Sequence, residues 1–322
     1  MSLTGPRHAA AFAPGHITGF FQIFDRDPEI AKRGSRGAGL CLDRGAVTLV
    51  EVAPSPTQQV EVFINKAPSE APVTRAAIQH LLQRALLEGK VDLNRDAPRG
   101  ERAKVHIRVH TELHLPVSQG FGMSAAGALS TSLALAKALG LGRSDAALAA
   151  HAADISEKGG LGDVAGALTG GFEIRKNPGL PPWGFVERLV GYGDVVLCVI
   201  GGPLETKKVL ADRERAQKIN AAGGRCVDEL LRGPSLERFM RLSREFAEES
   251  GLMTPVLAEA ADAVRSVGHA SMSMLGNSVF ALGKADPLAD ALEPYGEILR
   301  CGIGQEPAHL LQVEVPSSSG QP

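Results

Sequence analysis

The glycine-rich segment at residues 116–130, PVSQGFGMSAAGALS, carries the residue types that most often hold a phosphate group. It follows a strand-like stretch and leads into an uninterrupted helical pattern over 125–139. Gly120 and Gly122 let the backbone approach a ligand closely, and the free N–H groups and dipole of the following helix favour negative charge there. Walker A spacing is absent, and Ala125 stands where Gly-x-Gly-x-x-Gly has its third glycine. The segment predicts a phosphate loop of another type, with an ordinary strand-to-helix turn as the alternative.

One serine and two acidic residues could supply the rest of a phosphoryl transfer, which needs a divalent cation and a group that takes up the hydroxyl proton. Ser124 lies at the helix N-terminus, where its hydroxyl either reaches a magnesium ion or caps the helix. Asp163 lies among glycine and alanine, where a buried acid is costly unless it is paired or functional. Alternatively it caps a helix that begins at Val164. Asp154 shares a helix face with His151, three residues earlier.

The order Pro-x-x-x-Gly-x-Gly-x-Ser-Ala-Ala, which begins at Pro116, resembles the phosphate loop of the GHMP kinases. This family includes galactokinase, homoserine kinase, mevalonate kinase and phosphomevalonate kinase. Phe121 stands where the family usually has leucine, and Met123 stands where it usually has its first serine. The resemblance implies that ATP is bound by Pro116, Gly120, Phe121, Gly122, Met123, Ser124, Ala125 and Ala126.

A second stretch, Gly-x-x-Asp followed by six residues and Gly-Gly, ends at Gly171 and resembles the family motif that carries the catalytic aspartate. The resemblance implies that Asp163 is the base that accepts the proton of the acceptor hydroxyl. It also implies that Asp154 binds Mg²⁺ together with Ser124. Many members have glutamate at the position of Asp154, so the shorter side chain is a departure from the family pattern.

Three further motifs narrow the resemblance. The sequence APGHITG at 13–19 is similar to the first family motif, with His16 in place of lysine, which removes a permanent charge because histidine is mostly neutral at pH 7. With GSRGAGL at 34–40 and MLGNSVF at 274–280, the set is similar to the archaeal pantoate kinases over about residues 11–280. Those members phosphorylate the terminal hydroxyl of pantoate with ATP on the route to coenzyme A.

Pantoate carries one carboxylate, whose recognition needs a cation or a set of hydrogen-bond donors. The positions that match the family pattern are Ser35, His151, Arg175 and Thr206. Arg175 is the predicted carboxylate partner, because a guanidinium can donate two parallel hydrogen bonds, and Arg36 is a second cation worth testing. The alternatives are a surface charge for Arg175, turn chemistry for Ser35 and Thr206, and a packing role for His151.

Two other interpretations of these residues stay open. The acceptor could be another small hydroxy acid or alcohol, such as homoserine, shikimate or mevalonate. The chain could also be a non-catalytic nucleotide-binding protein, although the set of Ser124, Asp154 and Asp163 counts against that.

Strand and helix patterns are mixed without a regular β-α-β order, which predicts an α+β protein. Strands are expected at 46–52, 60–64, 104–113, 195–200, 272–282 and 297–301. Helices are expected at 75–88, 125–139, 144–156 (with Ser144 as N-cap), 208–222, 235–250 and 255–267. The resemblance implies the two-domain GHMP kinase fold, with a ribosomal S5 domain 2-like N-terminal domain at 1–191 and a ferredoxin-like C-terminal domain at 192–315. A disordered tail is expected at 316–322.

Composition gives no support for nucleic acid or an anionic membrane as a partner, because the formal net charge is −2 and the chain has one Trp and two Tyr. The four cysteines are Cys41, Cys198, Cys226 and Cys301. Their scattered positions favour reduced thiols in the cytoplasm over disulfides or a zinc site. No signal peptide or membrane span is predicted. Many family members pair, so the resemblance allows a homodimer.

Three histidines, His106, His110 and His114, share one face of the strand expected at 104–113. Side chains two residues apart along a strand are too spread for compact metal binding, so we expect a solvated polar face.

Overall fold

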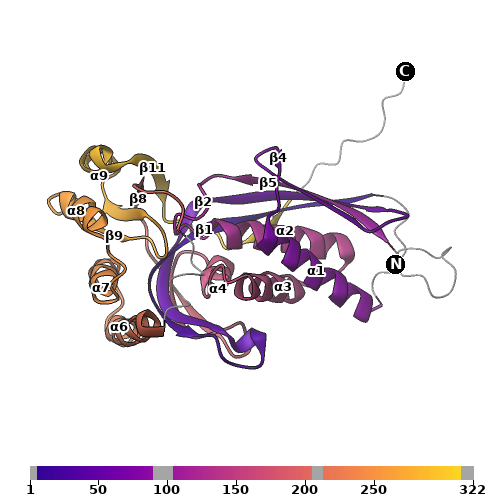
Figure 1. Cartoon of the computed structure of the whole chain (residues 1–322), viewed down its shortest axis with the longest axis horizontal. Helices are drawn as coiled ribbons and strands as arrows, with labels where there is room; N and C mark the ends of the chain where they lie inside the picture. The colour runs from indigo at the N-terminus through magenta and orange to yellow at the C-terminus, as the bar shows by residue number, and fades with distance from the viewer. Residues whose placement is uncertain (1–5, 90–103, 205–212, 313–322) are drawn as a thin grey trace, which may run out of the picture.

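The computed structural model describes residues 6–89, 104–204 and 213–312 (Figure 1). Within these residues, two β-sheets and the helices packed on them form an α+β arrangement, which confirms the predicted fold class. The strands are β1 (Arg7–Phe24), β2 (Gly34–Pro54), β3 (Gln59–Ile64), β4 (Ala67–Pro68), β5 (Val105–Leu113), β6 (Phe172–Asn177), β7 (Phe185–Leu189), β8 (Asp194–Val199), β9 (Gly268–Met272), β10 (Ser278–Gly283), β11 (Glu297–Gly302) and β12 (His309–Leu311). The α-helices are α1 (Pro72–Leu87), α2 (Met123–Leu139), α3 (Arg143–Ser156), α4 (Asp163–Thr169), α6 (Arg213–Leu231), α7 (Leu236–Glu249), α8 (Pro255–Ala263) and α9 (Ala285–Leu292). Short 3₁₀ turns are η1 (Ile30–Lys32) and η2 (Glu293–Tyr295).

The larger sheet has, in the described part of the chain, eight strands in the order β12-β1-β2-β5-β3-β4, with β6 and β7 continuing from β2. The helices α1, α2 and α3 lie together against one side of it (Figure 1), and α2 packs on β1 and β2. Val105, Ile107 and Val109 of β5 are buried toward these helices, whereas Arg108 and His110 are exposed. The predicted alternation of β5 is therefore confirmed, because only one face of this strand is covered.

The smaller sheet has the order β11-β8-β10-β9, and all its neighbouring strands are antiparallel. The two sheets are connected through β1, because α6 and α7 pack on this strand as well. Phe20 and Phe21 of β1 contact Phe239 and Phe246 of α7 in tilted ring pairs. In Figure 1 the long strands β1 and β2 curve away from the larger sheet toward α6. Helix α7 therefore links the two sheets, because it packs on β1 of the larger sheet and on β9 of the smaller one.

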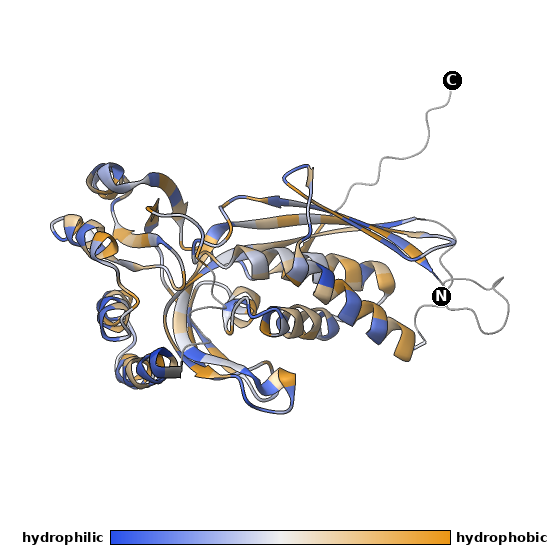
Figure 2. Cartoon of the chain, viewed as in Figure 1, coloured by the Kyte–Doolittle hydropathy of each residue, from blue (hydrophilic) through white to orange (hydrophobic). Residues whose placement is uncertain are grey.

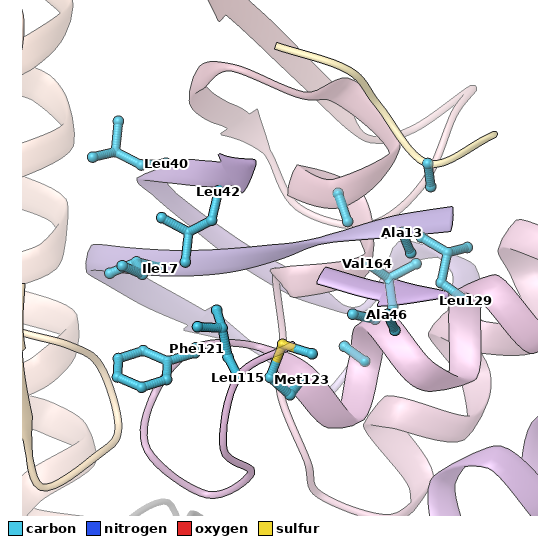
Figure 3. Packing of buried hydrophobic residues seen from close by; sticks show 14 of the residues in the cluster. Ala13, Ile17, Leu40, Leu42, Ala46, Leu115, Phe121, Met123, Leu129 and Val164 are labelled. Carbon is cyan, nitrogen blue, oxygen red and sulfur yellow. The ribbon is translucent and has the colours of Figure 1, made fainter. Parts of the chain in front are cut away.

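A single large cluster of buried apolar residues runs through both sheets. Figure 2 shows that α2 is mostly neutral to hydrophobic, as expected for a helix that is covered by the sheet and by two other helices. In Figure 3, Phe121 and Met123 lie in this cluster together with Leu115 and Ile17. Phe121 and Met123, the two residues that differ from the usual family loop, are therefore buried and pack the loop against the core.

Most predicted elements are present, with differences that have local causes. The helix expected from 144 begins at Arg143, and its N-cap is Gly142, so the prediction that Ser144 caps it is wrong. The Gly142 N–H donates instead to Asp145. The strand expected at 272–282 is two strands, because the chain turns between Met272 and Ser278. The first part of the helix expected from 208 and the tail at 316–322 lie outside the described residues.

The largest omission of the sequence analysis is β1, which spans 18 residues and includes the motif around His16. Its glycines and proline are typical of turns, and only pairing with β2 over most of its length makes the segment a strand. The last strand, β12, pairs with β1 and so joins the larger sheet. The proposed division at residues 191 and 192 stays a prediction.

None of the described helices is both long and apolar enough to cross a membrane. All four cysteines are free thiols, and three of them are buried.

Candidate active site

A cavity of about 430 Å³ lies where the start of α2 meets the segment between α3 and α4. Its wall also includes the start of α1, residues 203–204 and 274–275, and side chains from β1 and β2. The volume is within the range of pockets that bind small molecules. Segments from distant parts of the chain therefore enclose one binding space.

The glycine loop forms one side of this cavity. Gly122 is the N-cap of α2 with φ 64°, and no side chain of the described residues caps this helix. A Cβ on Gly122 would lie 2.9 Å from the carbonyl oxygen of His16, and a Cβ on Gly120 would lie 2.6 Å from that of Ser273. Both positions therefore require glycine, and the uncapped N–H groups of the first turn face a space where an anion is favoured.

Ser124 is exposed in the second position of α2 and lines the cavity. Because Gly122 is the N-cap and makes no side-chain hydrogen bond, the alternative that Ser124 caps the helix is wrong. The hydroxyl of Ser124 is therefore available to a ligand in the cavity.

Two carboxylates, those of Asp154 and Asp163, line the same cavity as this serine. A Cβ placed on Gly160 would lie 2.6 Å from Oδ2 of Asp163 and 3.0 Å from Oδ2 of Asp154, so the two oxygens converge on one point. Asp163 is the first residue of α4 and its N-cap is Gly162, so the capping alternative for Asp163 is wrong as well. Gly160 must lack a side chain for the carboxylates to approach so closely.

Asp154 is 3% exposed. Burial raises its pKa to about 8, the negative charge of Asp163 adds to the rise, and the Gly160 N–H opposes it. A cation between the two carboxylates would remove this repulsion, and hydroxyl and carboxylate oxygens are the ligands that Mg²⁺ prefers. The oxygen ligands that Ser124 and Asp154 present to the cavity are therefore of the kind that suits a magnesium ion.

Beneath Asp163 lies a buried histidine. Nδ1 of His16 donates to Oδ1 of Asp163 at 2.8 Å, and Nε2 donates to Oε1 of Glu173 at 3.0 Å. A ring that donates to two carboxylates carries a proton on each nitrogen. Burial lowers the pKa of His16, but the hydrogen bonds and charges of Asp163 and Glu173 outweigh it, and the pKa is raised overall. The two acids therefore favour the charged form of His16, in the opposite direction to the effect of its burial.

Arg175, the predicted carboxylate partner, is 1% exposed and lies under the cavity wall. Its guanidinium pairs with Glu173, Nε donates to Oγ of Ser35 at 3.2 Å, and Nη2 donates to Oγ1 of Thr18 at 3.3 Å. Ser35 and Thr18 themselves line the cavity. The alternative of a surface charge is wrong, since this arginine is buried and supports two cavity hydroxyls.

His151 is also buried, and its Nε2 donates to the carbonyl of Arg33 at 3.0 Å. Burial lowers its pKa, and hydrogen bonds to the Arg33 and Ile30 backbone oppose that fall. The ring anchors the segment that leads into Ser35.

Two further predicted residues are not part of this cavity wall as described. Thr206 lies outside the described residues, and Arg36 pairs with Asp228 on the surface.

Three residues of the site were not among the predicted ones: Glu173, Thr18 and Lys158. Glu173 and Arg175 are two apart in strand β6, so they lie on one face, and both are buried. An opposite-charge pair in a buried strand is costly unless it is structured, and this signal was available in the sequence. The part played by Thr18 depended on β1, which the sequence did not reveal.

A larger hollow, about 590 Å³, lies between α7, α8 and β9. Three of its four arginines, Arg241, Arg244 and Arg265, pair with neighbouring acids. The fourth, Arg238, donates to the carbonyl oxygen of Gly233. The residues predicted to take part in phosphoryl transfer line the first cavity and not this hollow.

Comparison with known proteins shows which family the chain resembles. Residues 75–171 match the family model described as the GHMP kinases N terminal domain. The chain is 37% identical over 279 residues to the pantoate kinase of Thermococcus kodakarensis, a match that covers 84% of this chain and 86% of the relative. A solved "phosphotransferase related to CoA biosynthesis pathway" has a TM-score of 0.79 at 32% identity, over 94% of this chain and 98% of the other. The structure "MDDEF in complex with MVAPP, AMPPCP and Magnesium" has a TM-score of 0.70 at 13% identity, over 96% of this chain and 100% of the other, and shows the shared fold.

The first of these relatives is more than a third identical over most of both chains. Such a match extends far beyond the short motifs and includes the strands and helices that surround the cavity. The predicted resemblance is confirmed by sequence and by fold. The chain therefore belongs to the GHMP kinase family, and within it to the family of the archaeal pantoate kinases.

Proposed function

We propose that this chain transfers the γ-phosphoryl group of ATP to the terminal hydroxyl of pantoate, giving 4-phosphopantoate and ADP. The observation that carries the proposal is the convergence of the uncapped start of α2, Ser124 and two carboxylates on one cavity. The relative from Thermococcus kodakarensis is a pantoate kinase, which supports this acceptor and this place in coenzyme A biosynthesis.

ATP binds with its phosphates at the start of α2. Lys158 is the only lysine or arginine among the described residues that line the cavity, and its ammonium supplies positive charge for the phosphates. Pro72, Val73 and Leu204 give the cavity an apolar wall for the nucleotide base. Magnesium, when held by Ser124 and Asp154, offsets the negative charge of the phosphates and of the carboxylates.

Asp163 is the base of the reaction. Its Oδ1 is fixed by His16, which leaves Oδ2 directed toward the cavity. The hydroxyl of the acceptor gives its proton to Asp163 as the hydroxyl oxygen bonds to the γ-phosphorus and ADP leaves.

The carboxylate of pantoate binds at Ser35 and Thr18. Each of these hydroxyls accepts a hydrogen bond from Arg175 and keeps its own hydrogen to donate. The hydroxyls of Ser35 and Thr18 can therefore both donate to the carboxylate of pantoate, and the positive charge of Arg175 behind them attracts this anion. Arg175 thus acts on the substrate through these two hydroxyls. Thr206 and His151 stay predicted substrate-binding residues.

The proposal is tested by ADP release over a panel of acceptors, which includes pantoate, homoserine, shikimate and mevalonate, with and without Mg²⁺. We expect turnover with pantoate that depends on Mg²⁺. Turnover with another acceptor and not with pantoate would show that the proposed substrate is wrong. Nucleotide binding without turnover on any acceptor would show that the chain is a non-catalytic nucleotide-binding protein.

Asp163→Ala should lower kcat by about 10²–10⁴-fold, because a positioned base contributes that factor. The Kd for ATP should stay nearly unchanged, since Asp163 does not contact the phosphates in this proposal. Steady-state kinetics and calorimetric titration with ATP measure the two effects. A variant that keeps wild-type kcat would exclude Asp163 as the base.

The four free thiols support a reducing compartment, and we propose the cytoplasm. We further propose a homodimer, which light scattering of the purified protein would test.

A further inference from the structure

We propose that Glu173 is a positioning residue that couples the base to the acceptor-binding hydroxyls. The inference rests on the proposed phosphoryl transfer, and names a group that does not itself line the cavity. Glu173 is fully buried in β6, and its Oε1 accepts from both His16 and Arg175. His16 leads to Asp163, and Arg175 leads to Ser35 and Thr18. One carboxylate oxygen therefore joins the two halves of the site.

Glycines surround this buried set and leave it the space that it needs. A Cβ on Gly39 or on Gly166 would lie 2.4 Å from Nε2 of His16. A Cβ on Gly37 would lie 2.7 Å from Nη2 of Arg175, and one on Gly162 would lie 2.6 Å from its Nε. Since real Cβ atoms do not come this close, side chains here would displace the charged groups. Gly37 and Gly39 of the GSRGAGL run, which lie within strand β2, thus leave room for buried charged groups.

The arrangement depends on the negative charge of Glu173. Nε2 of His16 and Nη1 of Arg175 lie 3.4 Å apart, and both carry hydrogens, so they cannot hydrogen-bond to each other when His16 is an imidazolium. Two cations this close repel each other strongly in a buried site unless an anion bridges them. Glu173 is that anion. Its other oxygen, Oε2, has no hydrogen-bond partner among the described residues, so the carboxylate is held almost entirely by these two cations.

Two consequences follow for the reaction. With Glu173 in place, the imidazolium of His16 stays directed at Asp163 and fixes the orientation of the base. The guanidinium of Arg175 stays directed at Ser35 and Thr18, whose own hydrogens then point to the acceptor. Removing the charge of Glu173 should therefore disturb both the chemical step and acceptor binding, but not the binding of ATP.

The experiment compares Glu173→Gln with the wild type and with Glu187→Gln. Glu187 is a matched control, because it lies on the neighbouring strand β7 and pairs with Lys176 at the surface. For E173Q we expect kcat to fall at least about tenfold and KM for the acceptor to rise several-fold, with KM for ATP unchanged. E187Q should match the wild type. Wild-type kcat and acceptor KM in folded E173Q would overturn the inference.

A double-mutant cycle separates this role from a general structural one. If Glu173 acts on the acceptor through Arg175 and Ser35, the rise in acceptor KM caused by E173Q should shrink in a Ser35→Ala background. If the two substitutions act independently, their fold-changes in acceptor KM multiply in the double variant. That result would contradict the coupling between Glu173 and Ser35.

His16→Gln is a second variant, which tests the same inference even if E173Q does not fold. A single amide cannot donate to both carboxylates in the place of the ring, whereas the pair of Glu173 and Arg175 is left intact. We expect a lower kcat with little change in acceptor KM, and an unchanged kcat would contradict the inference.

Nitrogen-15 NMR of the His16 ring gives a readout that does not need turnover. Near neutral pH both ring nitrogens should be protonated in the wild type, and the ring should lose a proton in E173Q. If the wild type acts on an acceptor other than pantoate, the proposed substrate fails while these tests still apply with that acceptor. A neutral His16 ring in the wild type would overturn the inference whatever the acceptor is.

Discussion

At the scale of single residues, this site is a set of charges whose signs alternate. Asp163, His16, Glu173 and Arg175 follow one another through the interior. Buried ions are costly one by one, and each is tolerated here because its neighbour has the opposite sign. Asp154 is the exception, since its nearest charged neighbour is another carboxylate. This uncompensated negative charge lies where the proposed magnesium ion would bind.

The pH dependence of stability should report the charge of His16. Its pKa in the folded protein is raised above 6.5, so its ion pairs contribute fully below that pH and are lost as the pH rises through the folded value. The difference in free energy of unfolding between the wild type and His16→Gln should therefore shrink as the pH rises above 6.5 and through the folded-state pKa of His16. Urea unfolding at several pH values measures it. A difference that grows with pH would contradict an imidazolium in the fold.

Magnesium alone should stabilise the wild type through Asp154. A tenfold excess of Mg²⁺ over its Kd adds about 1.4 kcal/mol to the free energy of unfolding, which raises Tm by about 2 °C or more. Asp154→Asn should lose most of this shift, whereas Asp228→Asn, at an exposed position, should keep it. Thermal unfolding with and without MgCl₂ measures the effect, and an equal shift in all three proteins would exclude Asp154 as a ligand.

At the scale of elements, α2 combines two tasks. Its apolar and small residues pack against β1, β2 and the helices α1 and α3. Its N-terminus is left uncapped at the cavity, where the dipole and the free N–H groups act on a ligand. The helix is rigid because it is buried, so the phosphate site needs no ordering when ATP arrives.

The two ends of α2 offer a matched pair of glycine substitutions. Gly122 and Gly140 both have left-handed backbone, but a Cβ meets the His16 carbonyl at 2.9 Å only at Gly122, and nothing lies within 4 Å at Gly140. Each alanine should cost about 1–2 kcal/mol of stability from backbone strain. Gly122→Ala should in addition raise KM for ATP, and Gly140→Ala should not. Equal KM values for the two variants would argue against the loop as the phosphate site.

At the scale of the whole molecule, the cavity lies between elements that belong to or pack on different sheets. Thr18 of β1, in the larger sheet, contributes to the cavity wall, and its carbonyl accepts from Met274 N–H of the segment between β9 and β10 at 3.3 Å. The start of α2, which packs on the larger sheet, and the 274–275 segment, which connects two strands of the smaller sheet, therefore line the same space. At the other end of the chain, β12 pairs with β1.

These contacts between elements of the two sheets predict that both sheets unfold together. Calorimetry should show one transition, with a calorimetric enthalpy equal to the van't Hoff enthalpy, because α7 packs on strands of both sheets and one buried apolar cluster includes residues of both. Two resolved transitions would mean that the smaller sheet unfolds by itself.

The order of short motifs in this chain was enough to predict the family, the glycine loop and the carboxylates. Gly120, Gly122 and Ser124 could be placed because loop and helix are local, and helix periodicity within one segment needs no distant partner. The same locality explains why Asp154 was assigned to the helix face that it occupies.

The network of His16 and Glu173 could not be predicted in this way. These residues are 157 positions apart, and only the pairing of β2 with β1 and β6 brings them into contact. The neutral state expected for His16 came from its pKa in water, whereas in the fold its pKa is raised by Asp163 and Glu173, which the sequence does not place beside it.

By itself, the sequence determined the kinds of groups at this site and the local backbone that presents them, because turns, helix ends and glycine positions depend on near neighbours. Only the tertiary structure decided which of those groups are paired, which are charged and which face the cavity. The physical reason is that protonation and ion pairing in a buried site depend on distances between strands that are far apart in the chain.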